Sequence, residues 1–108
     1  MQRQTLTDSA KRRAGEVASA MLQGSMPYLK GVIELVSLRE TLGIYENDPD
    51  FFAFTGVLAE INSLPLGSNL DNWTDENIAK YRDVISESEE WAKAFSSTQC
   101  RAIAERFG

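Results

Sequence analysis

The chain of 108 residues contains no histidine and one cysteine, Cys100. Histidine is the commonest general base and metal ligand, and it usually activates a serine or cysteine nucleophile. Without it, we expect Cys100 to be a packed small residue, and a zinc site is excluded. A single cysteine cannot form an intramolecular disulfide, which favours a reducing, cytoplasmic compartment. We expect no catalytic residue, no metal and no cofactor.

Long apolar runs are also missing. A membrane-spanning helix needs about 20 apolar residues, whereas the longest apolar-rich stretch, residues 51–59, is interrupted by Thr55 and Gly56. The first residues lead into a polar amphipathic segment and lack the apolar core of a signal peptide. Neither strand alternation nor a glycine-rich phosphate loop occurs. These absences predict a single all-α domain over residues 1–108 that contacts no membrane.

Positive charge is scarce in the middle of the chain. Residues 46–95 hold eleven acidic and three basic side chains, and the whole chain has a net charge of −5. Such a segment repels a phosphate backbone, so we expect no nucleic-acid partner. The basic run Lys11-Arg12-Arg13 is short, and we interpret it as a solvated helix face.

Apolar residues recur at helical spacing in four segments. The predicted helices cover residues 6–23, 26–42, 49–62 and 75–106. Gly24 and Gly43 are placed as C-terminal caps, and the short connection after Gly24 favours an antiparallel hairpin. The pattern predicts a compact four-helix bundle with an N-terminal helical hairpin and a long C-terminal helix. Five helices result if the last one breaks at Ser96-Ser97-Thr98, whose hydroxyls compete for backbone hydrogen bonds.

Particular side chains predict how the later helices begin and pack. Asp48 is placed as the cap of the third helix and Thr74 as the cap of the last. Gly56 weakens its helix by about 1 kcal/mol relative to alanine, which favours close packing against a neighbour. Leu64 and Leu66 interrupt a polar loop and are expected to be buried. Whether the loop at 63–73 forms a ligand pocket is left open.

Arg39 falls inside the apolar arc of residues 26–42. An unpaired buried charge costs roughly 3–5 kcal/mol, so a buried guanidinium needs a carboxylate. Glu60 is the predicted partner and Asp50 the second choice. We interpret the pair Arg39–Glu60 as structural.

Carboxylates cluster in sequence around the two loops that flank residues 49–62. They are Asp48, Asp50, Glu60, Asp71, Asp75 and Glu76. Paired carboxylates can bind Mg²⁺ or serve as acid and base. Helix capping and the helix dipole account for Asp48, Asp75 and Glu76 without any catalysis.

The last predicted helix has an apolar face, which includes Ile85, Ala92 and Phe95, and an acidic face opposite. The acidic stripe consists of Glu76, Asp83, Glu87 and Glu90, interrupted by Lys80. Val84 and Trp91 lie on its border. A solvated face explains this pattern, and so does a docking surface, because acidic surfaces steer basic partners and tryptophan is enriched at interface hot spots. As a docking surface, its partner-binding residues are Asp83, Glu87, Glu90 and Trp91.

Spaced features over about residues 20–95 resemble a group of small uncharacterised bacterial all-helical proteins. The features are Tyr28-Leu29-Lys30-Gly31, Leu38-Arg39, Leu42-Gly43, Asp48-Pro49-Asp50-Phe51, Phe54, Glu60, Leu64-Pro65-Leu66-Gly67 and Trp73. In that group the segment around Glu60 more often reads Ser-Glu-Thr-Asp, whereas here it reads Ala59-Glu60-Ile61-Asn62, so a polar site there is partly eroded. The resemblance implies a compact bacterial cytoplasmic domain, and it implies no activity, substrate or cofactor.

Three classes of function are compatible with these observations. We expect a non-enzymatic protein-binding domain, most concretely an immunity-type inhibitor that docks a basic partner, such as a bacterial nuclease toxin, through its acidic surface. The alternative is a structural or scaffolding module that forms a homodimer through its first and last helices. An enzyme that uses carboxylates with Mg²⁺ is the third class. The chain is expected to be a monomer or a homodimer, and the identity of the partner stays open.

Overall fold

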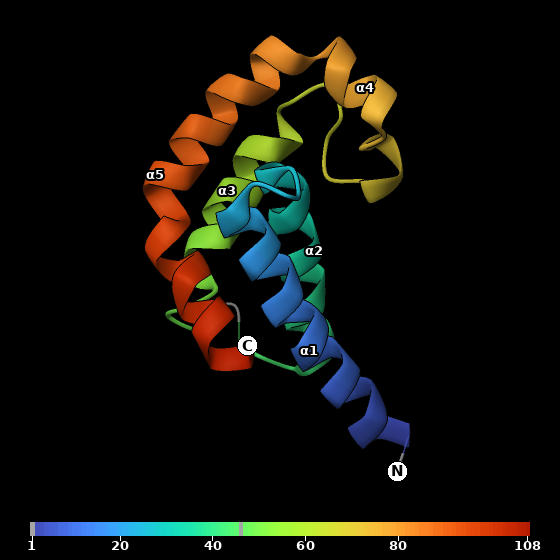
Figure 1. Cartoon of the computed structure of the whole chain (residues 1–108), viewed down its shortest axis with the longest axis vertical. Coiled ribbons are helices and arrows are strands. Elements are labelled where there is room, and N and C mark those ends of the chain that lie inside the picture. The colour runs from blue at the N-terminus through green and yellow to red at the C-terminus, as the bar shows by residue number, and fades with distance from the viewer. Residues whose placement is uncertain (1, 46) are drawn as a thin grey trace.

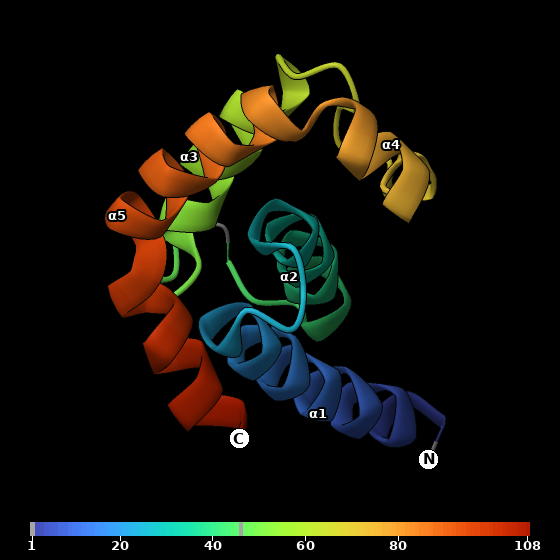
Figure 2. The same ribbon diagram turned by 45° about the horizontal axis from the view of Figure 1, so that its top comes forward.

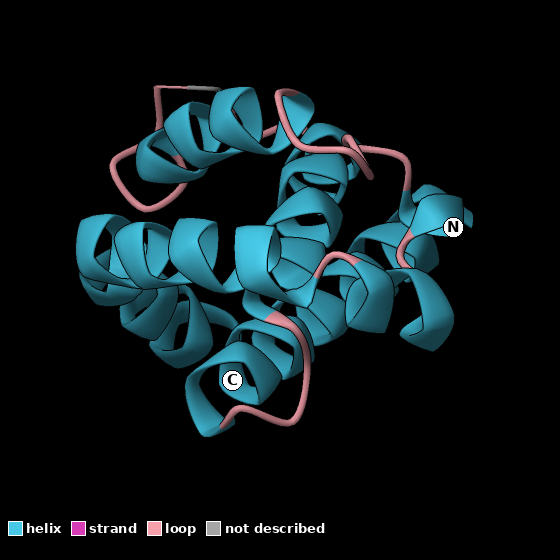
Figure 3. Ribbon diagram, turned by 90° about the horizontal axis from the view of Figure 1, so that it is seen from above, coloured by secondary structure: helices cyan, strands magenta, loops and turns pink. Residues whose placement is uncertain are grey.

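The computed structural model describes the backbone of residues 2–45 and 47–108 and the side chains of residues 7–45 and 47–108. Within these ranges the structure is helical and contains no strand (Figure 3). The elements are α1 (Gln2–Gln23), α2 (Tyr28–Leu42), α3 (Phe52–Asn62), the short 3₁₀ helix η1 (Leu70–Asn72), α4 (Asp75–Lys80) and α5 (Arg82–Phe107). The predicted all-α bundle is confirmed, and it has five α-helices in the described part of the chain.

The other helices surround α2. Helix α1 packs beside α2 to form a hairpin, and on the other side of α2 the helix α5 arches along α3 (Figure 1). A view turned toward the top of the molecule shows α2 near the centre, with α1, α3, α4 and α5 around it (Figure 2). Helix α1 also packs against α5, which closes the ring. Gly15 permits this close approach, because a Cβ atom there would lie 2.6 Å from the carbonyl oxygen of Phe107.

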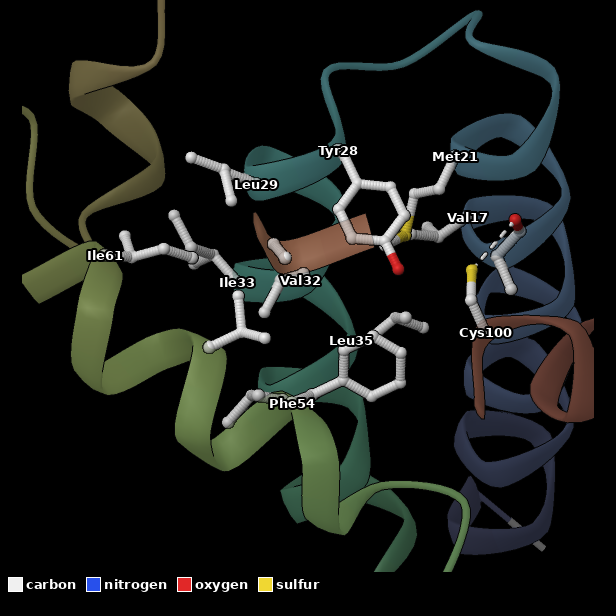
Figure 4. Packing of buried hydrophobic residues seen from close by; sticks show 14 of the residues in the cluster. Val17, Met21, Tyr28, Leu29, Val32, Ile33, Leu35, Phe54, Ile61 and Cys100 are labelled. Atoms are coloured by element: carbon white, nitrogen blue, oxygen red, sulfur yellow. Dashed lines mark hydrogen bonds between the residues drawn. The ribbon is translucent and has the colours of Figure 1, made fainter. Parts of the chain in front are cut away.

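The core fills the space between these helices. Its centre is formed by apolar side chains from α1, α2, α3 and α5, several of which are shown in Figure 4. They include Val17, Met21, Leu29, Val32, Leu35, Phe51, Phe54, Val57, Ile61 and Ile103. No helix in the described part of the chain is both long enough and apolar enough to cross a membrane.

The loop between α3 and α4 is also part of the core. Leu66 is buried, as predicted, and Leu64 packs against the core while staying partly exposed. Trp73 is buried at the other end of the loop, where its indole Nε1 donates to the carbonyl oxygen of Gly67 (2.9 Å). The loop is therefore a folded plug.

The C-terminal ends of the two hairpin helices lie where the sequence predicts, whereas α2 begins at Tyr28, two residues later than predicted. Gly24 and Gly43 both have the positive φ angles, 78° and 69°, that favour glycine after a helix. Thr74 caps α4 as predicted, since its hydroxyl accepts from the backbone N–H of Asn77 (3.2 Å). Helix α1 begins at Gln2, four residues earlier than predicted.

The start of α3 differs from the prediction. The helix begins at Phe52, and Asp48 caps a turn before it: its Oδ1 accepts from the backbone N–H of Asp50 (2.9 Å). Arg106 also donates to Asp48 and Asp50, at 3.2 and 3.1 Å, and so ties this turn to the end of α5. Asp48 is held in this turn by a partner that is distant in sequence.

The last predicted helix does break, but at a different place. The interruption lies at Tyr81, between α4 and α5, and α5 then runs through Ser96-Ser97-Thr98 without a break. The buried Ser96 hydroxyl donates to the carbonyl oxygen of Ala92 (2.7 Å), one turn back. Because this bond stays within the helix, the serine does not disrupt it.

Candidate functional site

The acidic stripe of α5 is present on the surface of the fold. Asp83, Glu87 and Glu90 are all exposed along this helix. Glu76, the fourth member expected, lies on α4, because the chain breaks at Tyr81. The structure therefore keeps three of the four acidic residues on one helix face and places Glu76 on another element.

Trp91 is an exposed aromatic residue beside this stripe. Its side chain is 45% exposed, and its ring stacks on that of Phe95, with centroids 5.2 Å apart and planes 14° apart. Phe95 was expected on the core face, and this prediction was wrong: it is 51% exposed. The core face of α5 carries the smaller residues Ser88, Ala92, Ser96 and Cys100. These allow the other helices to approach closely, and the Phe95 ring remains on the flank.

Helix α3 lies antiparallel to α5 along this flank. Phe51 contacts Phe107 near the start of α3, with ring centroids 6.3 Å apart. Further along α3, Gly56 lies beside the ring of Phe95. Phe52 is one helical turn before Gly56, on the same side of α3, and it is 62% exposed.

Gly56, Phe95 and Trp91 adjoin one another, and Phe52 and Val84 extend the same flanks of α3 and α5; we call this surface the α3–α5 seam. It consists of Phe52 and Gly56 from α3 and Val84, Trp91 and Phe95 from α5. Four of these are large apolar residues with more than two fifths of their surface exposed. Apolar residues gathered in this way mark interaction sites more often than scattered ones do.

The charges around the seam have one dominant sign. Asp83, Glu87 and Glu90 lie along its α5 edge, and the exposed Glu60 lies on the same side of α3 as Gly56. Helix α3 contains no lysine or arginine. The seam is thus an aromatic surface with an acidic rim, and sequence reasoning missed Phe52, Gly56 and Phe95 as parts of it. The one sequence signal for this surface was the large apolar side chain of Phe52, which the structure leaves exposed.

Arg39 is mostly buried, as predicted, but its partners are different. Its side chain is 13% exposed, and Nη1 donates to the carbonyl oxygen of Ile44 (3.0 Å). Nη2 lies 3.8 Å from the Glu40 carboxylate. No ion pair joins Arg39 to Glu60 within the described residues, and Asp50 is bound to Arg106. The main-chain carbonyl of Ile44 therefore binds the Arg39 guanidinium, where the sequence predicted the Glu60 carboxylate.

Cys100 belongs to a buried polar cluster. The Ser96 hydroxyl hydrogen is used by Ala92, so Tyr28 is the donor in the 2.7 Å hydrogen bond between Tyr28 and Ser96. The Cys100 thiol donates to the carbonyl oxygen of Ala18 (3.4 Å), as the dashed line in Figure 4 shows. Burial raises the pKa of Cys100 to about 11 and that of Tyr28 to about 12. At neutral pH the thiol is therefore protonated and enclosed.

Glu89 has a structural role that sequence reasoning did not identify. It extends from α5 to the start of α2, where Oε2 accepts from the backbone N–H of Tyr28 (3.1 Å). Pro27 precedes α2 and offers no side-chain cap, so the carboxylate from α5 satisfies this N–H instead. Glu89 also lines a hollow of about 360 Å³ between the α1–α2 connection and α5.

The remaining carboxylates do not gather into a metal site. Within the described residues, no group of three histidine, cysteine, aspartate or glutamate side chains is placed to hold a metal ion. Asp48 and Asp50, which lie in the loop before α3, are both bound to Arg106. Because both carboxylates pair with Arg106, we interpret the three residues as a structural ion cluster.

Comparison with known proteins gives no further guide to function. No family model matches the chain, and neither a curated protein nor a solved structure matches it. The resemblance to small bacterial helical proteins stays a prediction.

Proposed function

We propose that this chain is a non-enzymatic protein-binding domain that docks a basic protein partner through the acidic rim of the α3–α5 seam. The observation that carries the proposal is the exposed Trp91–Phe95 stack beside Asp83, Glu87 and Glu90. The most concrete form is an immunity-type inhibitor of a bacterial nuclease toxin, acting in the cytoplasm.

The aromatic stack supplies the contact energy that a charged surface alone lacks. Exposed ion pairs contribute at most about 1 kcal/mol each, whereas a buried interface tryptophan often contributes 2 kcal/mol or more. Trp91 and Phe95 leave about half of their surfaces available to a partner. The rim carboxylates then attract and orient a positively charged protein.

The composition of the chain supports binding over catalysis. Histidine is absent, the one thiol is buried, and the Asp48–Asp50 pair is bound to Arg106. A small acidic domain with a rigid helical face suits the blocking of a basic active-site cleft, because that cleft must attract a polyanion. The net charge of −5 has the sign that this requires.

Differential capture tests the proposal. The wild-type chain and the variant D83K/E87K/E90K are used as baits at low ionic strength. These three residues are exposed, so circular dichroism and the melting temperature should show an intact fold in both. We expect a basic protein to be retained by the wild type and lost from the variant. After purification, its affinity should fall at least about tenfold on charge reversal and should weaken with added salt.

Two results would overturn this function. One is that no protein distinguishes the two baits. The other is that the captured protein binds both with the same affinity. If the partner is a nuclease, its inhibition by the wild type and its activity in the presence of the variant identify the immunity role directly.

A further inference from the structure

Gly56 is a helical glycine that the fold itself does not require. It lies in the interior of α3, is exposed, and has no positive φ angle. A Cβ atom there would meet only the Phe95 ring, at 3.6 and 3.8 Å, which is ordinary contact. Glycine in such a position makes a helix less stable than alanine does. Among the described residues, no close packing at Gly56 requires the missing side chain.

The other helical glycines of the described chain show the contrast. At Gly15 a Cβ atom would collide with the backbone at Phe107, and at Gly31 it would collide with the Met21 side chain. Gly15 is therefore needed for helix packing, whereas a side chain at Gly31 would require the flexible Met21 side chain to move. Gly56 has room for a side chain and does not carry one, which leaves space beside the Phe95 ring for a group from another molecule.

Gly56 also occupies the centre of the α3–α5 seam. Phe52 lies one turn before it on α3, and the stacked rings of Phe95 and Trp91 lie beside it on α5. Gly56 itself is exposed and has the Phe95 ring on one side, so an incoming group can contact both the α3 backbone and that ring.

We propose that a basic amphipathic helix of the partner lies along the seam and seats an apolar side chain on Gly56, between Phe52 and Phe95. Its lysine or arginine residues then pair with the rim carboxylates. This inference rests on the proposed function and adds the kind of element that the partner presents. An amphipathic helix can bind along a groove on another protein. Its apolar anchor residues, which are one or two turns apart, then contact that groove.

Charge decides between this occupant and the others. A second copy of the chain, related by a two-fold axis, would bring the same surface against itself. The seam has carboxylates on both edges, Glu60 on α3 and Asp83, Glu87 and Glu90 on α5, and no basic residue among its members, so either orientation brings like charges together, which is repulsive. An anionic lipid surface is repelled for the same reason. A basic helix is attracted at each of these positions.

The test uses synthetic helical peptides as defined probes. One peptide of about 15 residues, or four turns, carries leucines on one face and lysines on the other. A second has the same composition, with its leucines distributed around the helix. Titration into isotopically labelled protein is followed by NMR and by the fluorescence of Trp91, since the other tryptophan, Trp73, is buried. We expect the amphipathic peptide alone to shift signals along 52–60 and 84–95.

Substitutions on α3 provide matched controls. Gly56→Leu fills the seat, and Thr55→Leu adds the same side chain at the adjacent exposed position, which faces about 100° away. We expect Gly56→Leu to weaken peptide binding at least about fivefold, and Thr55→Leu to leave it unchanged. Gly56→Ala should raise the melting temperature while weakening binding, which separates stability from docking.

The possible results distinguish this inference from the proposed docking function on which it rests. Equal binding by wild type and Gly56→Leu, equal binding of the two peptides, or shifts outside the seam would overturn the seating on Gly56. If D83K/E87K/E90K still abolishes capture of the natural partner, the acidic docking function stands without it. A dimer detected by sedimentation, with the seam protected, would overturn the choice of occupant.

Discussion

Alkaline pH is expected to destabilise this fold through two buried groups, Tyr28 and Cys100. Burial raises the pKa of Cys100 from 9.0 to about 11 and that of Tyr28 from 10.0 to about 12. In both cases the folded state holds the proton more tightly than the unfolded state does. The stability that this provides is present below about pH 9 and is lost as the pH rises through the folded-state values.

The size of the effect follows from these values. Near pH 10.5, unfolding would release the Cys100 proton almost completely, and the loss of stability relative to pH 8 is about 2 kcal/mol. Tyr28 adds about 1 kcal/mol at the same pH, because its unfolded-state pKa is higher. Together they remove about 3 kcal/mol from a domain whose total stability is on the order of 5–15 kcal/mol.

Urea denaturation at several pH values between about 8 and 10.5 measures this loss. The matched control is the double variant Tyr28→Phe/Cys100→Ala, which lacks both titrating groups. We expect it to be less stable than wild type at pH 8, since Ser96 loses the Tyr28 hydroxyl, but to change much less as the pH rises. If the double variant kept the wild-type pH dependence, the reasoning from burial would be refuted.

Three further predictions concern packing, the ion cluster and capping. Phe54→Ala should cost about 3–5 kcal/mol by urea denaturation because Phe54 is fully buried, whereas Phe52→Ala should cost less than about 1 kcal/mol; equal costs would contradict the packing described. Arg106→Ala should cost about 1 kcal/mol at most, and less in high salt, because its contacts to Asp48 and Asp50 are partly solvated; a salt-independent loss would argue against an ionic origin. Thr74→Ala should cost about 1 kcal/mol through the lost cap of α4, and thermal denaturation with no change would contradict this role.

Local signals predicted much of this fold. The hairpin of α1 and α2 could be read from Gly24 and Gly43, because a positive φ angle after a helix is a property of the residue itself. The buried Leu66 could be predicted because a large apolar residue in a loop has few other places to go. These features depend on nearby residues alone.

Other features depend on distant partners and could not be read locally. Glu89 caps α2 from 61 residues away, and Asp48 is held by Arg106, 58 residues further along the chain. Arg39 binds the carbonyl oxygen of Ile44, whose position follows from the path of a loop. The break at Tyr81 carries no proline or glycine signal, so the local sequence does not mark it.

The candidate surface was predicted in part. The helical period placed Asp83, Glu87, Glu90 and Trp91 on one exposed stripe, and the structure keeps them there. The same period assigned Phe95 to the core. A helical wheel gives only the angle of a residue about its own axis, so it does not reveal which flank a neighbouring helix leaves uncovered.

The central claim is that the aromatic stack of the seam binds a basic partner. Its most direct measurement is the affinity of the captured partner for Trp91→Ala/Phe95→Ala, compared with wild type and with Leu22→Ala, an exposed apolar residue on α1. We expect an affinity loss of about a hundredfold for the double variant, an unchanged affinity for Leu22→Ala, and intact folds for both. A double variant that binds as tightly as wild type would contradict it.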